Sequence, residues 1–259
     1  MKQNFYKYQG TGNDFVIIDN RNGSFDKTNV EFIAKLCNRR YGIGADGLIL
    51  LEDHADYDFK MVYYNADGNE SSMCGNGGRC ITHFAQFLKI IQNKATFEAI
   101  DGVHHALIKG NKVKLQMQDV SELKKYDDAI ILDTGSPHYV CMQPIVNALD
   151  VNKKGAAIRY NKSFVKEGIN VNFVEKINSD EFSVRTYERG VEGETLSCGT
   201  GVTATAIAMN YIGETEKNLI TLQTQGGSLS VSFDRFKDSY QNIWLIGPAH
   251  QVYKGEIEW

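Results

Sequence analysis

The sequence has few of the features that mark linkers, secretion or membrane insertion. It has 3 prolines in 259 residues, and no run rich in Ser or Gly indicates a flexible linker. No apolar run is long enough to span a bilayer, and residues 1–7 lack the apolar core of a signal peptide. A formal charge of −4 gives no electrostatic case for binding nucleic acid or an anionic membrane. We therefore expect a cytoplasmic protein with neither of those partners.

Cysteine is also too sparse for a disulfide scaffold. The chain has 5 cysteines, at positions 37, 74, 80, 141 and 198, whereas a disulfide framework has an even number that is more densely spaced. We expect reduced thiols. Cys37, Cys80 and Cys141 occur in periodic apolar segments, which predicts that they fill core space.

The other two cysteines belong to a repeated motif. Cys74 precedes a glycine-rich turn and then an apolar-periodic helix, and Cys198 does the same. Each has a glutamate four residues upstream, Glu70 or Glu194. Two copies of Glu-x3-Cys-Gly-[Asn/Thr]-Gly predict two similar half-molecules, each of which contributes one cysteine to a shared site.

Hydrophobic periodicity predicts the same plan of strands and helices in both halves. Helices are expected at Val30–Arg40, from Cys74 to about Ile91, in part of Ile145–Tyr160, and from Cys198 to about Ile212. The expected strands of the first half are Asp14–Asp19, Gly47–Glu52, Tyr57–Asn65, Ala95–Ile100, Val103–Ile108 and Lys112–Met117. Those of the second are Ala129–Thr134, His138–Gln143, Ile169–Val174, Phe182–Glu188, Leu219–Thr224, Leu229–Phe233 and Ile243–Ile246, with a last strand at Gln251–Trp259. A polar stretch after residue 117 divides the chain into halves 1–117 and 118–248, and residues 249–259 are expected to complete the first half.

The position of the two cysteines at helix starts predicts their chemistry. A helix start presents unsatisfied N–H groups and the positive end of the helix dipole, which favours thiolate over thiol. The same N–H groups can hold the carboxylate of a small substrate. Two thiols on separate halves suit a reaction in which one removes a proton from a carbon and the other returns a proton to the opposite face. Such a reaction inverts a stereocentre without pyridoxal phosphate.

Three other readings of these motifs fit less well. Cys74, Cys80 and His83 are spaced more widely than the ligands of common zinc sites, so we expect no metal. The glycine motifs at 42–47 and 199–204 lack the strand-to-helix context and the lysine of nucleotide-binding loops. A disulfide oxidoreductase would carry its two cysteines in one turn.

At these residues the chain resembles the diaminopimelate epimerase family. The matching segments cover nearly the full length: Gly10–Val16, Gly42–Gly47, Asn65–Gly68, Cys74–Gly77, Pro137–His138, Asn170–Val171, Tyr187–Gly190 and Glu194–Gly201. The resemblance implies an α/β (α+β) fold of two pseudo-symmetric halves, each a mainly antiparallel β-sheet wrapped around a central helix. It also implies a homodimer without cofactor that interconverts LL- and meso-diaminopimelate in lysine and peptidoglycan-precursor biosynthesis.

The resemblance also assigns roles to residues. Cys74 and Cys198 would be the acid–base pair, and His138 and Glu188 would adjust their protonation. The remaining matched residues would bind substrate: Gly75, Asn76, Gly199 and Thr200 at the reacting carboxylate, and Asn13, Asn65, Asn170, Glu188 and Arg189 elsewhere. A substrate with two ammonium and two carboxylate groups needs both acceptors and a forked cation, which these side chains supply.

The chain departs from the family pattern in places. Ser136 stands where many relatives have Asn, so the contact made by that amide is missing, and the loop from Glu188 to Cys198 is one residue longer than the commonest spacing. Gly47 stands where some relatives have Gln. Two alternatives stay open: a proline or hydroxyproline racemase-like enzyme, which usually has His where Asn76 stands, and a non-catalytic small-molecule-binding protein, which would not need both cysteines.

Overall fold

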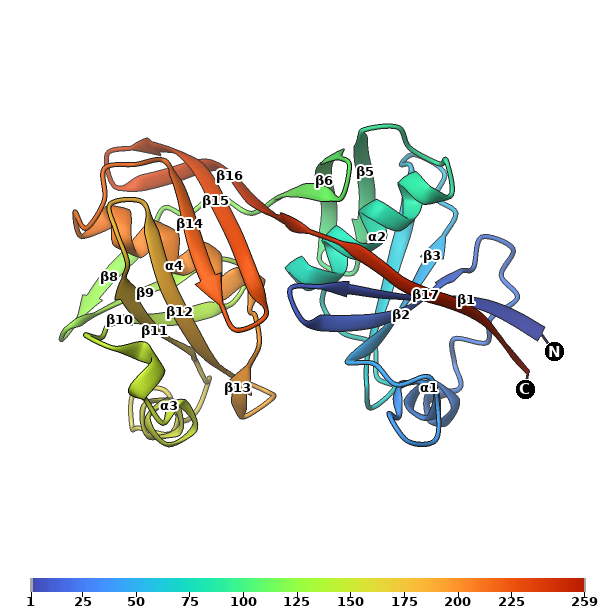
Figure 1. The fold of residues 1–259 in the computed structure, drawn as a ribbon, viewed down its shortest axis with the longest axis horizontal. Coiled ribbons are helices and arrows are strands. Elements are labelled where there is room, and N and C mark those ends of the chain that lie inside the picture. The colour runs from blue at the N-terminus through green and yellow to red at the C-terminus, as the bar shows by residue number, and fades with distance from the viewer. Residues whose placement is uncertain (1, 259) are drawn as a thin grey trace. The chain divides into compact units, whose positions relative to one another are not determined.

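The chain folds into two compact units, shown as ribbons in Figure 1. The computed structural model describes residues 2–258, so Met1 and Trp259, which belong to the predicted first half, lie outside the described residues. One unit contains the residues up to Leu115 together with those from Gly247 onward, and the other contains Gln116–Ile246. The first unit holds Cys74 and the second holds Cys198.

The first unit is built on a sheet whose outer strand comes from the end of the chain. Its strands are β1 (Lys2–Gly10), β2 (Asn13–Asp19), β3 (Gly47–Glu52), β4 (Phe59–Asn65), β5 (Lys94–Ala99), β6 (Gly102–Lys109), β7 (Lys112–Gln116) and β17 (His250–Glu258). Strand β17 pairs antiparallel with β1. From β1 to β7 each strand pairs with the next, and the β2–β3 and β4–β5 pairs are parallel while the others are antiparallel.

The second unit repeats this order of pairings. Its strands are β8 (Leu123–Tyr126), β9 (Ala129–Asp133), β10 (Pro137–Met142), β11 (Asn170–Lys176), β12 (Glu181–Glu188), β13 (Gly193–Thr195), β14 (Leu219–Thr224), β15 (Gly227–Phe236) and β16 (Ser239–Pro248). The pairs β10–β11 and β12–β14 are parallel, and the pairs β8–β9, β9–β10, β11–β12, β14–β15 and β15–β16 are antiparallel. Strand β9 therefore corresponds to β1, and β16 corresponds to β7.

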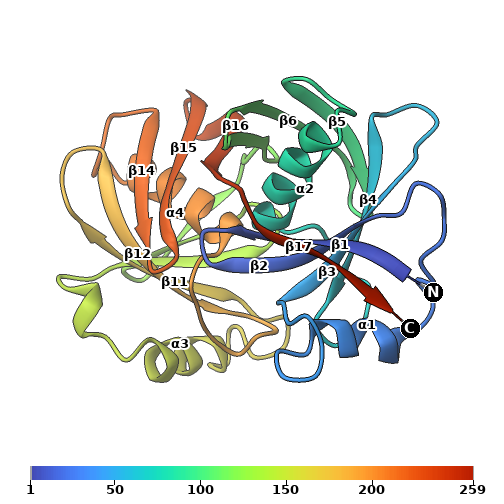
Figure 2. The same ribbon diagram turned by 45° about the vertical axis from the view of Figure 1, so that its right-hand side comes forward.

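Each unit also has one helix that is almost wholly buried. Helix α2 (Gly75–Phe87) packs on β1, β2, β3 and β6, and helix α4 (Gly199–Tyr211) packs on β9, β10, β11, β12, β14 and β15. Figures 1 and 2 both show α2 beside β1 and β17, and α4 beside β14 and β15. The predicted fold class, a mainly antiparallel sheet around a central helix in each of two similar halves, is confirmed.

A second helix in each unit covers another face of the sheet. Helix α1 (Val30–Cys37) packs on β3 through Ile33, Leu36 and Cys37, in an apolar cluster with residues of β2 and β4. Helix α3 (Val151–Arg159) and the short 3-10 helix Val146–Ala148 pack on β11 and β12. Each unit therefore has apolar contacts on two faces of its sheet, as the apolar run in β3 indicates for the first unit.

The structure corrects several predicted bounds. Helix α2 ends at Phe87 rather than about Ile91, because Lys89 takes a positive φ of 60° that turns the chain, although Ile91 is still buried. Helix α1 ends at Cys37 rather than Arg40. Three strands were not predicted: β1 and β8, which are rich in polar residues, and the short β13. Among the described residues, no helix is long and apolar enough to cross a membrane.

Candidate active site

Cys74 is the N-cap residue of α2. Its backbone is extended, at φ −101° and ψ 146°, and its Sγ accepts a hydrogen bond from the Gly77 N–H at 3.2 Å. The sulfur thus takes the place of the oxygen that usually caps a helix. Gly75 and Asn76 are the first helical residues, so their backbone N–H groups belong to the first turn, where N–H groups point out of the helix start. This end of α2 can therefore bind a negative group beside the sulfur.

Asn13 and Asn76 lie next to Cys74. The Asn76 Nδ2 donates to the Asn13 Oδ1 at 3.3 Å, and the Cys74 Sγ is 3.8 Å from the same oxygen. The Asn13 Nδ2 donates in turn to the Asp46 Oδ2 at 2.6 Å. The structure therefore brings together three of the residues that the sequence assigns to the site.

Asn65 is not joined to that cluster. It ends β4, it is exposed, and its backbone N–H donates to the Asn69 carbonyl at 3.0 Å. A substrate role for Asn65 stays a prediction.

Cys198 occupies the equivalent position at the start of α4. It is the N-cap, with φ −111° and ψ 112°, and its Sγ lies 3.4 Å from the Thr200 Oγ1. Burial raises the pKa of the Cys198 thiol, the nearby Glu188 carboxylate raises it further, and the Thr200 hydroxyl acts in the opposite direction. A backbone hydrogen bond from Gly201 at the helix start favours the thiolate, as expected, but desolvation and the neighbouring negative charge outweigh it at Cys198.

A glycine in the first turn of each helix leaves room for the sulfur. A Cβ at Gly77 would lie 3.3 Å from the Cys74 Sγ, and a Cβ at Gly201 would lie 3.4 Å from the Cys198 Sγ. At Gly201 it would also approach the Asn172 Oδ1 to 2.4 Å, which no real contact allows. The third residue after each cysteine is glycine, but only at Gly201 does a Cβ meet a severe clash, with the Asn172 Oδ1.

Glu188 is the last residue of β12 and is directed to Cys198 by its contacts. Its Oε1 accepts a short hydrogen bond from the Thr195 hydroxyl in the loop before the cysteine. Its charge and a side-chain hydrogen bond both raise the pKa of the Cys198 thiol. Glu188 can therefore take a proton from this thiol or return one to it.

His138 is a fully buried, neutral imidazole. Burial lowers its pKa to about 3, and the positive charge of Arg189 lowers it further. Asn172 accepts from the Thr186 hydroxyl at 3.0 Å through Oδ1, so its Nδ2 donates to the His138 Nδ1 at 3.0 Å. The imidazole proton is then on Nε2, and this atom has no hydrogen-bond partner among the described residues. His138 therefore presents a free N–H donor.

Asn170, Arg189 and Ser136 form a second polar group in the same unit. The Asn170 Oδ1 accepts from the Arg189 N–H at 2.9 Å, and its Nδ2 donates to the Ser136 Oγ at 2.8 Å. The Arg189 guanidinium donates to the Glu167 carbonyl at 3.0 Å and lies 3.4 Å from the Ser136 Oγ. Ser136, which departs from the family pattern, is therefore the acceptor that fixes the Asn170 amide.

The upstream glutamates of the repeat do not face the cysteines. Glu194 forms a two-point ion pair with Arg185 at 2.6 and 2.7 Å, and Arg185 also donates to the carbonyls of Val146 and Leu149. Glu70 is exposed and lies opposite Tyr64 in an isolated bridge. The Arg185–Glu194 pair fastens the loop before Cys198 to the body of its unit.

The remaining cysteines are structural, as the sequence predicts. Cys37, Cys80 and Cys141 are buried, and burial raises the pKa of each thiol to about 12. None of the five cysteines forms a disulfide. Among residues 2–258, no group of three or more His, Cys, Asp or Glu side chains is placed to hold a metal ion.

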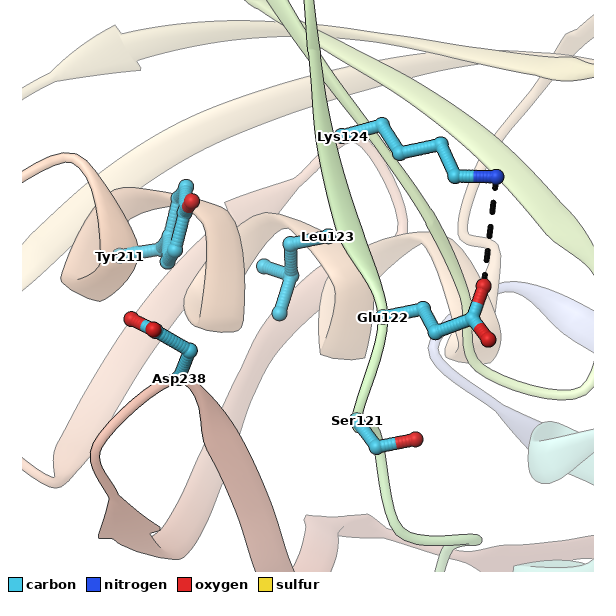
Figure 3. A pocket seen from close by; sticks show the side chains of 6 residues that line it. All are labelled: Ser121, Glu122, Leu123, Lys124, Tyr211 and Asp238. Carbon is cyan, nitrogen blue, oxygen red and sulfur yellow. Dashed lines mark ion pairs between the residues drawn. The ribbon is translucent and has the colours of Figure 1, made fainter.

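A surface hollow of about 350 Å³ lies in the second unit, next to β8 and the end of α4 (Figure 3). Ser121, Leu123, Tyr211 and Asp238 line it, together with the pair Glu122 and Lys124, whose charged ends are 4.0 Å apart. These two side chains are 83 % and 75 % exposed. Neither proposed acid–base cysteine lines the hollow, and we assign it no role.

Three further residues hold the site residues in place, and the sequence did not predict them. Asp46, Arg79 and Asn172 each make hydrogen bonds to a residue predicted to act in the site. Asp46 lies in the matching segment Gly42–Gly47, and Arg79 lies in the glycine-rich stretch after Cys74. Their position within those motifs was the only available signal, because side-chain contacts across strands leave no periodic pattern.

Comparison with known proteins gives one consistent result. The profile of the family described as diaminopimelate epimerase matches residues 5–123 and 130–252. The diaminopimelate epimerase of Flavobacterium psychrophilum is 56 % identical over 253 residues, which cover 97 % of this chain and 99 % of that protein. The diaminopimelate epimerase of Chlorobaculum tepidum is 43 % identical over 96 % of this chain and 98 % of its own length.

Solved structures of lower identity share the fold. A Bacillus anthracis phenazine biosynthesis protein of the PhzF family superposes with a TM-score of 0.79 at 14 % identity, covering 100 % of both chains. A hydroxyproline epimerase from Agrobacterium vitis superposes with a TM-score of 0.71 at 12 % identity, covering 99 % of this chain and 92 % of that one. At such identities the likeness shows a common fold and carries no information about substrate.

Proposed function

Because the chain belongs to the diaminopimelate epimerase family, we propose that it interconverts LL- and meso-diaminopimelate by moving a proton at one α-carbon. The observation that carries this proposal is the pair of N-capping cysteines, Cys74 and Cys198, at equivalent helix starts in two units of the same topology. The reaction belongs to the synthesis of lysine and peptidoglycan precursors.

The chemistry follows from two thiols in opposite protonation states. One sulfur, as thiolate, takes the α-proton, so that the Cα–H bond breaks and an S–H bond forms. The electron pair left on carbon is delocalised into the adjacent carboxylate. The other thiol then gives its proton to the opposite face of the carbon, and the reverse direction uses the two sulfurs in exchanged roles. No electron is gained or lost, so the reaction needs no redox cofactor. In place of pyridoxal phosphate, we expect the N–H groups at the two helix starts to stabilise the negative charge that develops beside the carbon.

The protonation state of Cys198 fits the donor role for one direction. Burial and the Glu188 carboxylate raise the pKa of its thiol, which keeps the proton on sulfur at neutral pH. Cys74 accepts a hydrogen bond from the Gly77 N–H, which stabilises negative charge on its sulfur. We infer that Cys198 is the thiol in the resting enzyme and that Cys74 is the sulfur that takes the α-proton in this direction.

The other predicted residues divide into two sets. The amides of Gly75, Asn76, Gly199 and Thr200 would hold the reacting carboxylate and stabilise the charge that develops beside it. Asn13, Asn65, Asn170, Glu188 and Arg189 would bind the remaining ammonium and carboxylate groups, and His138 and Glu188 would adjust the protonation of the thiols. The Nε2–H of His138, which has no partner among the described residues, supports this role.

We further propose that the enzyme is a homodimer in the cytoplasm. The family resemblance supports a homodimer. A cytoplasmic setting is supported by the sequence, in which we expect reduced thiols because the cysteines show no disulfide pattern.

The test is an assay of the purified protein with LL-diaminopimelate in D2O and no added cofactor. The expected result is formation of meso-diaminopimelate with solvent deuterium at the inverted carbon, and little exchange with free L-proline. Preferential turnover of proline or hydroxyproline would assign the protein to the racemase alternative. Binding of diaminopimelate without any exchange would assign it to the non-catalytic alternative.

A further inference from the structure

A buried cation lies in the second turn of α2, close to Cys74. The Arg79 side chain has no exposed surface. Its guanidinium donates to four neutral acceptors: the Gly75 carbonyl at 3.1 Å, the Thr11 hydroxyl at 3.1 Å, the Asn76 Oδ1 at 2.9 Å and the Pro248 carbonyl at 3.4 Å. Burying a guanidinium against neutral partners is costly, so its retention calls for a role.

The approach of β1 to α2 keeps this cation in place. A Cβ at Gly10 would lie 3.2 Å from the Arg79 Nη2 and 3.3 Å from the Cys80 Sγ. Burial lowers the Arg79 pKa to about 10, so the guanidinium remains charged at neutral pH, and the charges of Cys80 and Cys74 act on it in the opposite direction. Arg79 is therefore in electrostatic contact with Cys74 as well as hydrogen-bonded to the residue two after it.

A carboxylate occupies the other end of the same hydrogen-bond chain. The Asp46 Oδ2 accepts from the Asn13 Nδ2 at 2.6 Å, and its Oδ1 accepts from the Arg39 guanidinium at 2.7 Å. Asn76 accepts from Arg79 through Oδ1 and donates to the Asn13 Oδ1 through Nδ2 at 3.3 Å. In every hydrogen bond of this chain, the group nearer Arg79 donates and the group nearer Asp46 accepts. This order fixes the orientation of the Asn76 and Asn13 amides, because each must accept through its oxygen and donate through its nitrogen.

We propose that Arg79 and Asp46 are positioning residues that act through Asn76 and Asn13 to set which amide atom faces the Cys74 sulfur. With the chain in place, the Asn13 Oδ1 lies 3.8 Å from the Cys74 Sγ. A carbonyl oxygen there accepts from a thiol and opposes a thiolate. The Gly77 N–H and the positive charge of Arg79 favour the thiolate. The two ends of the chain therefore act on Cys74 in opposite directions.

The second unit has no equivalent of this chain at its cysteine. Thr203 follows Cys198 by the same number of residues as Arg79 follows Cys74, and its hydroxyl donates to the Gly199 carbonyl at 3.0 Å. Cys198 has the Glu188 carboxylate nearby instead. A cation beside one thiol and an anion beside the other give two equivalent helix starts different proton affinities. This inference rests on the proposed function for its catalytic meaning, although the hydrogen-bond chain itself does not depend on it.

The experiment measures the ionisation of each cysteine by its alkylation rate. Wild type, Asp46→Asn and Arg79→Met are treated with iodoacetamide from pH 5 to pH 10, and the modified peptides are quantified by mass spectrometry. Asp46→Asn replaces a carboxylate, which can only accept from the Asn13 amide, by an amide that can also donate, and it removes a negative charge. Cys74 should therefore alkylate about threefold to tenfold faster near pH 7, which is the effect of one hydrogen bond. Arg79→Met removes the cation, so Cys74 should alkylate more slowly by a similar factor.

The pH dependence of alkylation at Cys74 can be assigned to the Cys74 thiol itself, because the ionisable groups around it are known. Arg79 and Cys80 are ionisable side chains in electrostatic contact with it, and burial raises the pKa of Cys80 to about 12. Cys80 therefore stays protonated over most of the range. The Cys198 profile should be unchanged in both variants, since a general loosening of the fold would alter both cysteines.

Two further variants separate the proposal from a loss of folding. Arg39→Gln removes an ion-pair partner that Asp46 shares with Asp14 and leaves the Asn13 contact intact. Its Cys74 profile should match wild type within about twofold, even though Asp14 loses an ion pair. Arg79→Lys keeps the charge in a smaller group, so its profile should lie between wild type and Arg79→Met. If Arg79→Met does not fold, Asp46→Asn and Arg79→Lys still carry the test.

The outcomes distinguish this proposal from the proposed function. An unchanged Cys74 profile in Asp46→Asn, or equal changes at Cys74 and Cys198, would overturn the positioning role even if wild type inverts diaminopimelate. Opposite changes at Cys74 in Asp46→Asn and Arg79→Met would support it even if wild type shows no inversion. In an active enzyme, Asp46→Asn should raise KM for diaminopimelate by a larger factor than it lowers kcat, because Asn13 is expected to bind substrate.

Discussion

The substitution Gly201→Ala should destabilise the second unit through a single buried side chain. The new Cβ would lie 2.4 Å from the Asn172 Oδ1, so the amide has to move. Asn172 is fully buried and makes hydrogen bonds to the Thr186 hydroxyl at 3.0 Å, the His138 Nδ1 at 3.0 Å and the Tyr139 carbonyl at 3.2 Å. A displaced amide cannot keep all three bonds at good geometry.

The magnitude follows from those bonds. Each contributes about 1 kcal/mol, and alanine regains about 1 kcal/mol over glycine in a helix. The expected net loss is therefore about 2 kcal/mol in the free energy of unfolding, or roughly 4–8 °C in Tm for a chain of this size. Inversion of diaminopimelate should also slow, because His138 loses the contact that fixes its imidazole.

The matched control is Gly77→Ala at the equivalent position of α2. There the new Cβ would meet flexible side-chain ends, the Ile49 Cδ1 at 3.2 Å and the Met61 Cε at 3.3 Å, beside the Cys74 Sγ at 3.3 Å. These atoms can give way, so its stability should stay within about 1 kcal/mol of wild type. Urea unfolding followed by circular dichroism measures both variants. Equal stability of Gly201→Ala and wild type, or equal losses in both variants, would refute the reasoning.

Three other substitutions test separate parts of the account. Glu188→Gln removes a negative charge that raises the pKa of Cys198, so the pH profile of Cys198 alkylation should move to lower pH. An unchanged profile would show that Glu188 does not act on the thiol. Ser136→Ala removes the acceptor for the amide of Asn170, and steady-state kinetics should show KM for diaminopimelate raised about threefold to tenfold with a smaller change in kcat. Burial acts to raise the pKa of Asp14, but hydrogen bonds from Arg39 and Lys7 hold that pKa well below its usual range. Asp14→Asn should therefore lower the free energy of unfolding by about 2–3 kcal/mol at pH 7. Thermal unfolding scans should show this difference in stability between wild type and variant at pH values above about 3.9, the pKa of Asp in an unfolded chain. The difference should shrink as the pH falls below that value. A difference that does not depend on pH would exclude the ion pair as its cause.

The fold was predictable where hydrophobic pattern and turn residues agree. Strand β3 runs from Gly47 to Glu52 as predicted, because an apolar run is bounded by glycine on one side and acidic residues on the other. Helix α2 was predicted too long for two reasons. Ile91 continues the apolar pattern although it is a buried residue beyond the helix. The positive φ that ends the helix is taken by Lys89 and not by a glycine, so the sequence shows no stop signal there. Strand β1 was missed because Lys7, which is paired with Asp14 in the structure, made the segment look solvated.

The candidate site was predictable where one residue type at a helix start carries the chemistry. The sequence placed Cys74 and Cys198 as N-caps because glycine turns precede apolar helices, and both are N-caps. Their difference in environment was predicted only in part. The family resemblance assigned Glu188 to the protonation of the thiols. Arg79 was not predicted, because its side chain reaches the start of α2 through contacts that no sequence period encodes.

The central claim is that two thiols share the inversion, and inversion by the single cysteine variants tests it most directly. Cys74→Ala and Cys198→Ala are each incubated with LL-diaminopimelate in D2O, and both the formation of meso-diaminopimelate and deuterium at the α-carbon are measured against wild type. The account predicts that wild type inverts with incorporation of solvent deuterium and that neither variant forms the inverted product, because each face of the carbon needs its own proton carrier. Inversion at the wild-type rate by either variant would contradict it.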